Sequence, residues 1–254
     1  MKANTRYLLK RYAIVPIAVA YVIFMTAVVF RRGEYATGAV VCVVTIGGPL
    51  IVYFWARRKG LLVFKYPTAD RAIALYHGFK SRSQDSIALM AYSSAFAATL
   101  YGDFDRAREE LASINWSFLP PLYQGFETYI HSLLAIFEAG DYSRALTLAK
   151  EARDLCDVSG KFPGAKKSRA TFDAHLDVCE SLSGNNPPAR LAQLDIASRE
   201  LPGVSAAIPA WALATYHTGA GEFAEARRYA AIVTRLVPHC TPLTTMPRSR
   251  IIRF

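Results

Sequence analysis

Two residues that could bind a metal ion, a histidine and a cysteine, stand at helical spacing in the second half of the sequence. His175 and Cys179 are four residues apart, so a helix would place both on one face, beside Asp173 and Asp177. Imidazole and thiolate groups bind zinc and related transition metals. Two such ligands are too few for a metal site, and the same spacing is typical of side chains packed in a helical core. We therefore predict ordinary packing here and no bound metal.

The cysteines and the known motifs point away from catalysis. No two cysteines form a C-x-x-C pair, which argues against a zinc ribbon or a thioredoxin-type motif. The sequence also lacks the H-E-x-x-H, G-x-S-x-G and G-x-x-x-x-G-K-[ST] patterns of metalloproteases, hydrolases and nucleotide-binding proteins. We predict a protein that is not an enzyme and needs no cofactor, with buried thiols in a reducing compartment. An enzyme with an unrecognised site is the remaining alternative. The cysteines are Cys42, Cys156, Cys179 and Cys240.

The net charge of +10 is concentrated at the N-terminus. Residues 1–65 contain ten of the 30 basic residues and one of the 20 acidic ones, Glu34. Because the rest of the chain is nearly neutral, the basicity does not predict a nucleic-acid-binding protein.

The basic residues of this region flank two long runs of uncharged residues. They are Ala13–Phe30 and Gly38–Ala56, each bracketed by Lys or Arg. As helices they would be about 27 to 29 Å long, close to the hydrocarbon thickness of a bilayer. Buried core helices and a cleavable signal peptide are the alternatives, but neither run has a polar stripe, and no A-x-A cleavage pattern precedes Arg31. The sequence predicts a transmembrane hairpin that is retained as an anchor.

Basic residues flanking the two spans predict the orientation. Four precede the first span and four lie between Arg57 and Lys65, whereas the short loop carries only Arg31 and Arg32. We expect both termini and the rest of the chain on the cytoplasmic side of a bacterial-type inner membrane. Arg31 and Arg32 would favour the opposite topology. Small residues and a helix-bending proline predict close packing between the spans, at Gly47, Gly48 and Pro49.

A turn signature recurs in the C-terminal part of the chain. The segment GDFDRA at 102–107 recurs as GDYSRA at 140–145 and GEFAEA at 221–226, with a weaker copy, GNNPPA, at 184–189. We expect the glycine to end one helix in a left-handed conformation, the next residue to cap the following helix, and the alanine to let the two helices approach closely. The aromatic residue is expected to pack under the turn. Proline is expected to end the second helix of three copies, at Pro120, Pro202 and Pro238.

The signature predicts four helix pairs and one linking helix. Residues 66–80 read as a linking or capping helix, with Ala72, Leu75, Tyr76 and Phe79 on one face. The predicted pairs are 85–101 with 105–114, 126–139 with 142–156, 171–183 with 188–200, and 205–219 with 223–236.

The turn motif, the spacing of 37 to 44 residues between glycines and the closing prolines resemble the tetratricopeptide repeat (TPR) family over residues 85–240. The third copy departs most, with Asp177 and Glu180 where the family has small or aromatic residues. The resemblance implies an all-α superhelix whose concave face binds a peptide or a helix of a partner protein. It places first-helix residues on that face: Leu89, Tyr92, Phe96, Thr99, Glu127, Ile130, Leu134, Phe137, Trp211 and Thr215.

Two basic patches lie outside the hairpin. A solvated loop is the default interpretation of the first patch, and contact with anionic lipid is the minority hypothesis for both. Nucleic acid is disfavoured because residues 66–247 contain 17 basic and 19 acidic residues. The patches are Lys161, Lys166, Lys167 and Arg169, and Arg248, Arg250 and Arg253.

The expected organisation is an N-terminal membrane anchor followed by a helical-repeat domain. Its parts are a basic flank (1–12), two spans (13–30 and 38–56) joined by a loop (31–37), a basic flank with a linking helix (57–84), the repeats (85–240) and a tail (241–254). The predicted function is a membrane-anchored protein-protein interaction adaptor. The alternative is a structural subunit of a larger membrane complex, held mainly by its hairpin.

Overall fold

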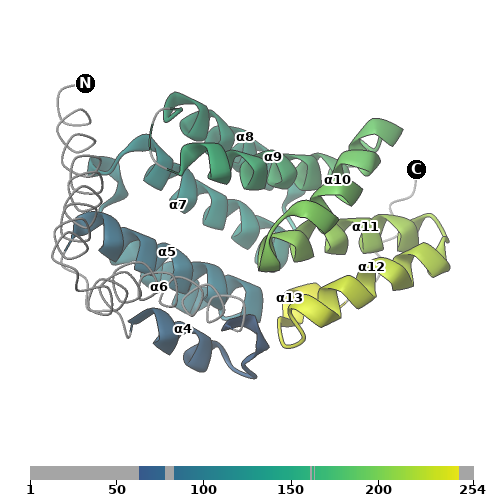
Figure 1. Cartoon of the computed structure of the whole chain (residues 1–254), viewed down its shortest axis with the longest axis horizontal. Coiled ribbons are helices and arrows are strands. Elements are labelled where there is room, and N and C mark those ends of the chain that lie inside the picture. The colour runs from purple at the N-terminus through teal and green to yellow at the C-terminus, as the bar shows by residue number, and fades with distance from the viewer. Residues whose placement is uncertain (1–62, 78–82, 161, 163, 246–254) are drawn as a thin grey trace, which may run out of the picture. The chain divides into compact units, whose positions relative to one another are not determined.

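The computed structural model describes residues 63–77, 83–160, 162 and 164–245. All regular structure in these residues is helical (Figure 1). No described helix combines the length and the apolarity that a membrane span requires. Both predicted spans, with Gly47, Gly48 and Pro49, lie outside the described residues, as does the tail beyond Thr245.

Four helix pairs follow one short helix along the chain. A 3-10 turn, Val63–Lys65, precedes α4 (Ala69–His77). The pairs are α5 (Gln84–Tyr101) with α6 (Phe104–Ala112), α7 (Pro121–Leu134) with α8 (Tyr142–Val158), α9 (Ala165–Leu182) with α10 (Pro188–Glu200), and α11 (Ala207–Gly219) with α12 (Phe223–Leu236). Other 3-10 turns span Trp116–Phe118 and Gly203–Ala206, and α13 (Thr241–Thr244) is the last described helix.

The predicted helices agree with the observed ones, most closely in the second helices of the third and fourth pairs. The bounds of α10 and α12 match residue for residue, whereas α7 and α9 begin five and six residues before the predicted starts. Pro121 stands at the first position of α7, where its missing N–H costs nothing. The linking helix is shorter than predicted: in α4, Ala72 is buried and Leu75 and Tyr76 are partly buried, while Phe79 lies outside the described residues.

The glycines of the turn signature behave as predicted in all four copies. Gly102, Gly140, Gly184 and Gly221 all have positive φ, between 64° and 90°. This left-handed conformation lets the chain leave one helix and reverse into the next, and it strongly favours glycine.

The other parts of the signature hold in some copies only. Asp103 and Asp141 cap their helices by accepting a hydrogen bond from the backbone N–H three residues later. Glu222 does not cap α12, because its carboxylate instead binds Nδ1 of His217 at 2.5 Å. The aromatic ring at the turn is partly buried in the first two copies, but Phe223 is 62% exposed, so the prediction that it packs under the turn is wrong.

One of the three prolines expected to end a second helix does not do so. Helix α6 ends at Ala112, and Pro120 instead precedes α7 as its N-cap residue. Pro202 and Pro238 each follow the last residue of a helix by two positions.

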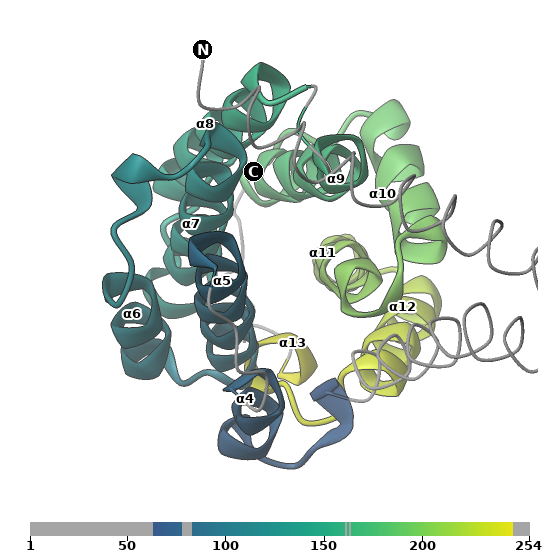
Figure 2. The ribbon, with the colours of Figure 1, turned by 60° about the vertical axis from the view of Figure 1, so that its left-hand side comes forward.

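The end of the helical domain packs against its beginning. The first helices α5, α7, α9 and α11 lie toward the middle of the domain, with α6, α10 and α12 on its outside (Figure 2). The short helix α13 contacts α5, α11 and α12. A Cβ added at Gly102 would lie 3.5 Å from Pro242, and Cys240 and Leu243 are buried. The inner side of the first helices is therefore largely a hydrophobic core.

Candidate partner-binding groove

An open groove of about 770 Å³ lies between α5, α7, α9 and α10. Tyr92 of α5, Phe126 of α7 and Phe172 of α9 supply the aromatic part of its lining. The wall on α10 includes Gln193 and Ile196, and the side chain of Ile196 is 43% exposed. The groove is thus an exposed surface of mixed aromatic, aliphatic and polar character.

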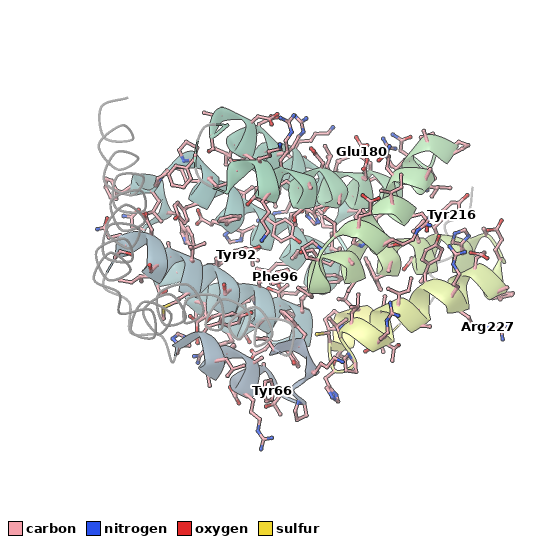
Figure 3. The ribbon with its side chains drawn as sticks, viewed as in Figure 1. Tyr66, Tyr92, Phe96, Glu180, Tyr216 and Arg227 are labelled. Carbon is pink, nitrogen blue, oxygen red and sulfur yellow. The ribbon has the colours of Figure 1, made fainter. Side chains whose placement is uncertain are left out.

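The aromatic rings of the groove belong to a cluster that continues into the core. The rings of Tyr92 and Phe126 stack with centroids 4.6 Å apart and an interplanar angle of 26°, and Phe126 is 5.7 Å from Phe172. Tyr92 is also 6.0 Å from Phe96, which packs on Tyr129 at 6.0 Å (Figure 3). Such ring pairs add about 0.5 to 1.5 kcal/mol beyond area burial. They hold Tyr92 and Phe126 in fixed positions at the groove surface.

Three carboxylates line the groove, and two of them are held by arginines. Asp173 accepts a hydrogen bond from Arg153 Nε at 3.1 Å, and Asp177 lies 3.6 Å from Arg190 Nε. Burial raises the pKa of Asp177, while Arg190 opposes that shift. Glu200, the third carboxylate, has no ion pair among the described residues.

Tyr92 is the one predicted binding residue that lines this groove. Thr99 and Ile130 are completely buried, so their side chains cannot meet a partner in this conformation. Phe96 and Trp211 are also buried, at 8% and 5% exposure. These positions belong to the hydrophobic core, where Phe96 packs on Phe64 and Tyr129.

The remaining predicted binding residues lie near the core or at its edge. Phe137 is half-buried and packs on Trp211 with ring centroids 5.1 Å apart. Thr215 donates a hydrogen bond to the backbone oxygen of Trp211 at 2.9 Å. Leu134 is buried, and Leu89 is 41% exposed on α5.

A π-helical turn explains why Phe126 was missed. Residues Ala135–Ala139 (η4) form a π-helix directly before Gly140, and a π turn holds more residues than an α turn. Counting back from Gly140 as if the helix were regular therefore selects Glu127 and Ile130. The residues one position earlier, Phe126 and Tyr129, are those that contact Tyr92 and Phe96.

Glu127 lies in a different hollow. This second hollow, of about 680 Å³, is lined by residues of α6, α7 and α8 and of the intervening turn, Glu127 and Glu151 among them. Burial and the nearby Glu151 carboxylate raise the pKa of Glu127. The hollow therefore favours a cationic occupant electrostatically, but no described group shows what would fill it.

The register of the third copy could have revealed two more groove residues. Tyr92 stands ten residues before Gly102, and the same count back from Gly184 gives Ala174. Leu89 corresponds to Thr171 by the same rule, and both Thr171 and Ala174 line the groove. Phe172 and the α10 residues follow no repeat register, so sequence reasoning had no signal for them.

The residues considered as metal ligands form a buried contact instead. His175 Nε2 lies 2.8 Å from Ser132 Oγ and 3.6 Å from Cys179 Sγ. Burial lowers the pKa of His175 to about 3 and raises that of Cys179 to about 12. Both groups are therefore neutral at physiological pH, and neither is accessible to a substrate.

The nearby acidic residues do not complete a metal site. Asp173 and Asp177 face Arg153 and Arg190 respectively. In the described part of the chain, no three His, Cys, Asp or Glu side chains are grouped so that they could hold a metal ion.

One of the predicted lipid-binding cations is already paired. Arg169 Nη1 lies 3.2 Å from Asp157, and its Nε lies 3.7 Å from Asp173. Lys166 and Lys167 are exposed at the start of α9. Lys161, Arg248, Arg250 and Arg253 lie outside the described residues.

No family model matches the chain, and comparisons with curated proteins and with solved structures also returned no match.

Proposed function

We propose that the chain is a membrane-anchored scaffold that recruits a partner protein through the groove between α5, α7, α9 and α10. The groove carries this proposal, because half-buried aromatic side chains held in place at an open concave surface are typical of binding hot spots. The two uncharged runs, 13–30 and 38–56, are proposed to form the anchor, with the helical domain in the cytoplasm.

The helical domain is proposed to be a TPR-like array in which the third pair is irregular. Four left-handed glycines at helix ends and close Ala contacts in three of the pairs support this assignment. Tethering the array to the bilayer would raise its effective concentration near other membrane proteins.

Crosslinked affinity purification from membranes tests the groove. We expect a Tyr92→Ser, Ile196→Ser variant to recover its partner roughly tenfold less than the unaltered chain, because the two substitutions remove apolar surface that lines the groove, half-buried at Tyr92 and exposed at Ile196. The matched control is Phe118→Ser, Phe223→Ser, which removes exposed aromatic rings outside the groove. Equal recovery by both variants would contradict a groove-mediated function.

The same experiment separates the adaptor from a subunit held by its hairpin. If the groove variant keeps its partners, while replacing residues 1–60 with an unrelated two-span anchor loses them, the structural-subunit function is favoured. Labelling of an engineered cysteine at Lys65→Cys from outside intact cells would reverse the proposed topology.

A further inference from the structure

Two unpaired, oppositely charged side chains line the groove. Lys167 lies in the first turn of α9, and Glu200 is the last residue of α10. Both are exposed, and neither forms an ion pair among the described residues. The other charged groups of the groove, Asp173 and Asp177, are already bound by arginines. Lys167 and Glu200 are thus the charges that remain free to bind an occupant.

The antiparallel course of the pair places these two charges on opposite walls at the same end. Only Ser183–Pro187 separates α9 from α10, so the two helices run in opposite directions, and the start of α9 and the end of α10 both border the groove. An extended peptide rises about 3.3 Å per residue, so the end residues of a five-residue segment lie about 13 Å apart.

The groove stays open because the third pair is held by ion pairs. Ala189, the alanine of the turn signature, is exposed rather than packed against α9. In its place, Arg190 contacts Asp177 and Glu180 and donates to the backbone oxygen of Asn185 (Glu180 is labelled in Figure 3). The small side chains Ala170, Ala174 and Ala197 then line the space between the helices.

We propose that the occupant is an extended peptide segment with a bulky apolar side chain between one acidic and one basic residue. Its acidic residue pairs with Lys167, its basic residue pairs with Glu200, and its apolar side chain packs on Tyr92 and Phe126. This inference rests on the proposed function and specifies the chemistry of the partner. Opposite charges on facing walls select against segments that carry two charges of the same sign.

Charge-exchange binding with defined peptides tests the inference. The probes are fluorescein-labelled Glu-Gly-Phe-Gly-Lys, Lys-Gly-Phe-Gly-Lys and Glu-Gly-Phe-Gly-Glu, titrated with the full chain in detergent micelles and followed by fluorescence anisotropy. The unaltered protein should prefer the first peptide. Lys167→Glu should shift the preference to the dibasic peptide, and Glu200→Lys to the diacidic one, each by about tenfold.

Lys166→Glu is the matched control, because Lys166 is exposed beside Lys167 but does not line the groove. It should leave the order of the three peptides unchanged. The inference is overturned if no peptide binds the unaltered chain, if preference does not follow the charge exchange, or if Lys166→Glu acts like Lys167→Glu. Loss of partner capture by the Tyr92→Ser, Ile196→Ser variant would still support the proposed function in each of those cases.

Discussion

The second and third helix pairs use the same turn signature but are held together in different ways. In the second pair, Ala145, Ala149 and Ala152 are buried, and a Cβ added at Gly125 of α7 would lie only 3.1 Å from the backbone oxygen of Ala152. The side chain of Ser132 also donates to the backbone oxygen of Ala145 at 2.8 Å. Small residues therefore bring α7 and α8 into close backbone contact.

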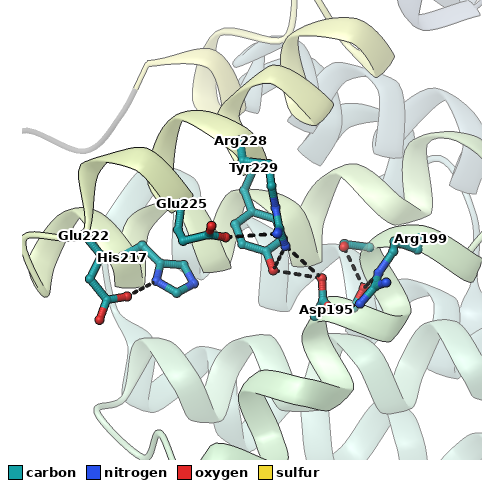
Figure 4. A network of polar contacts seen from close by, with 8 residues as sticks. Asp195, Arg199, His217, Glu222, Glu225, Arg228 and Tyr229 are labelled. Atoms are coloured by element: carbon teal, nitrogen blue, oxygen red, sulfur yellow. Dashed lines mark hydrogen bonds and ion pairs between the residues drawn. The ribbon is translucent and has the colours of Figure 1, made fainter.

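The third pair lacks this close contact at its turn. Ala189 is exposed, and Arg190 binds carboxylates of α9 instead. On its other side, α10 is joined to α12 by polar contacts: Asp195 accepts a hydrogen bond from Tyr229 at 2.8 Å and lies 3.4 Å from Arg228 (Figure 4). Small residues thus close a helix pair, whereas charged side chains can hold one open and leave a groove.

The largest contrast is expected from placing the same bulky residue in both turns. Ala145→Leu should lower the free energy of unfolding by about 1 to 3 kcal/mol, because the new side chain has no space against α7. Ala189→Leu should change it by less than about 0.5 kcal/mol, because the position is exposed. Urea unfolding of the full chain, followed by tryptophan fluorescence, measures both. Similar losses would remove the distinction between the pairs.

Acidification should lower the free energy of unfolding, because it protonates His175, which joins α9 to Ser132 of α7. The folded-state pKa of His175 is about 3, below its unfolded value near 6.5, so the unfolded chain binds an extra proton between these pH values. Stability is fully present above pH 6.5 and should fall by up to about 1.4 kcal/mol per unit as the pH decreases toward 3. The free energy of unfolding should differ less between pH 7 and pH 5 in the His175→Leu variant than in the unaltered chain. An unchanged difference would contradict the burial of a neutral imidazole.

Removing the arginine of the third pair should cost less but should affect the groove. Arg190→Ala leaves Asp177 and Glu180 without their cation, with an expected loss of about 1 to 2 kcal/mol. The control is Arg144→Ala at the turn of the second pair, where the exposed side chain forms no ion pair among the described residues. Thermal unfolding at low and high salt measures both. Equal losses of stability in Arg190→Ala and Arg144→Ala would show that ion pairs do not hold the third helix pair together differently from the second.

The smallest contrast concerns helix capping. Asp141→Ala should cost about 1 kcal/mol, because its carboxylate accepts from the N–H of Arg144 at 2.9 Å. Asn185→Ala should have little effect, since α10 begins after Pro187 without a side-chain cap. Calorimetry of the two variants would show the difference, and a larger loss for Asn185→Ala would contradict it.

Local chemistry made much of the helical pattern predictable. Left-handed glycines and apolar spacing depend on neighbours within one or two turns, so they located α10 and α12 to the residue. The groove was less predictable. Only Tyr92 was identified, because the π turn before Gly140 shifted the face of α7 and because Arg190 displaced the expected packing of the third pair.

Turn and capping interactions are local, so the amino-acid sequence alone predicts an all-helical domain built from paired helices. Which faces of these helices are accessible depends on how the helices pack against one another. Phe96 packs on Phe64 and Tyr129, which are far from it in the chain, and Thr99 and Ile130 are completely buried. Exposure depends on what covers a side chain, and that information is not contained in the spacing along one helix.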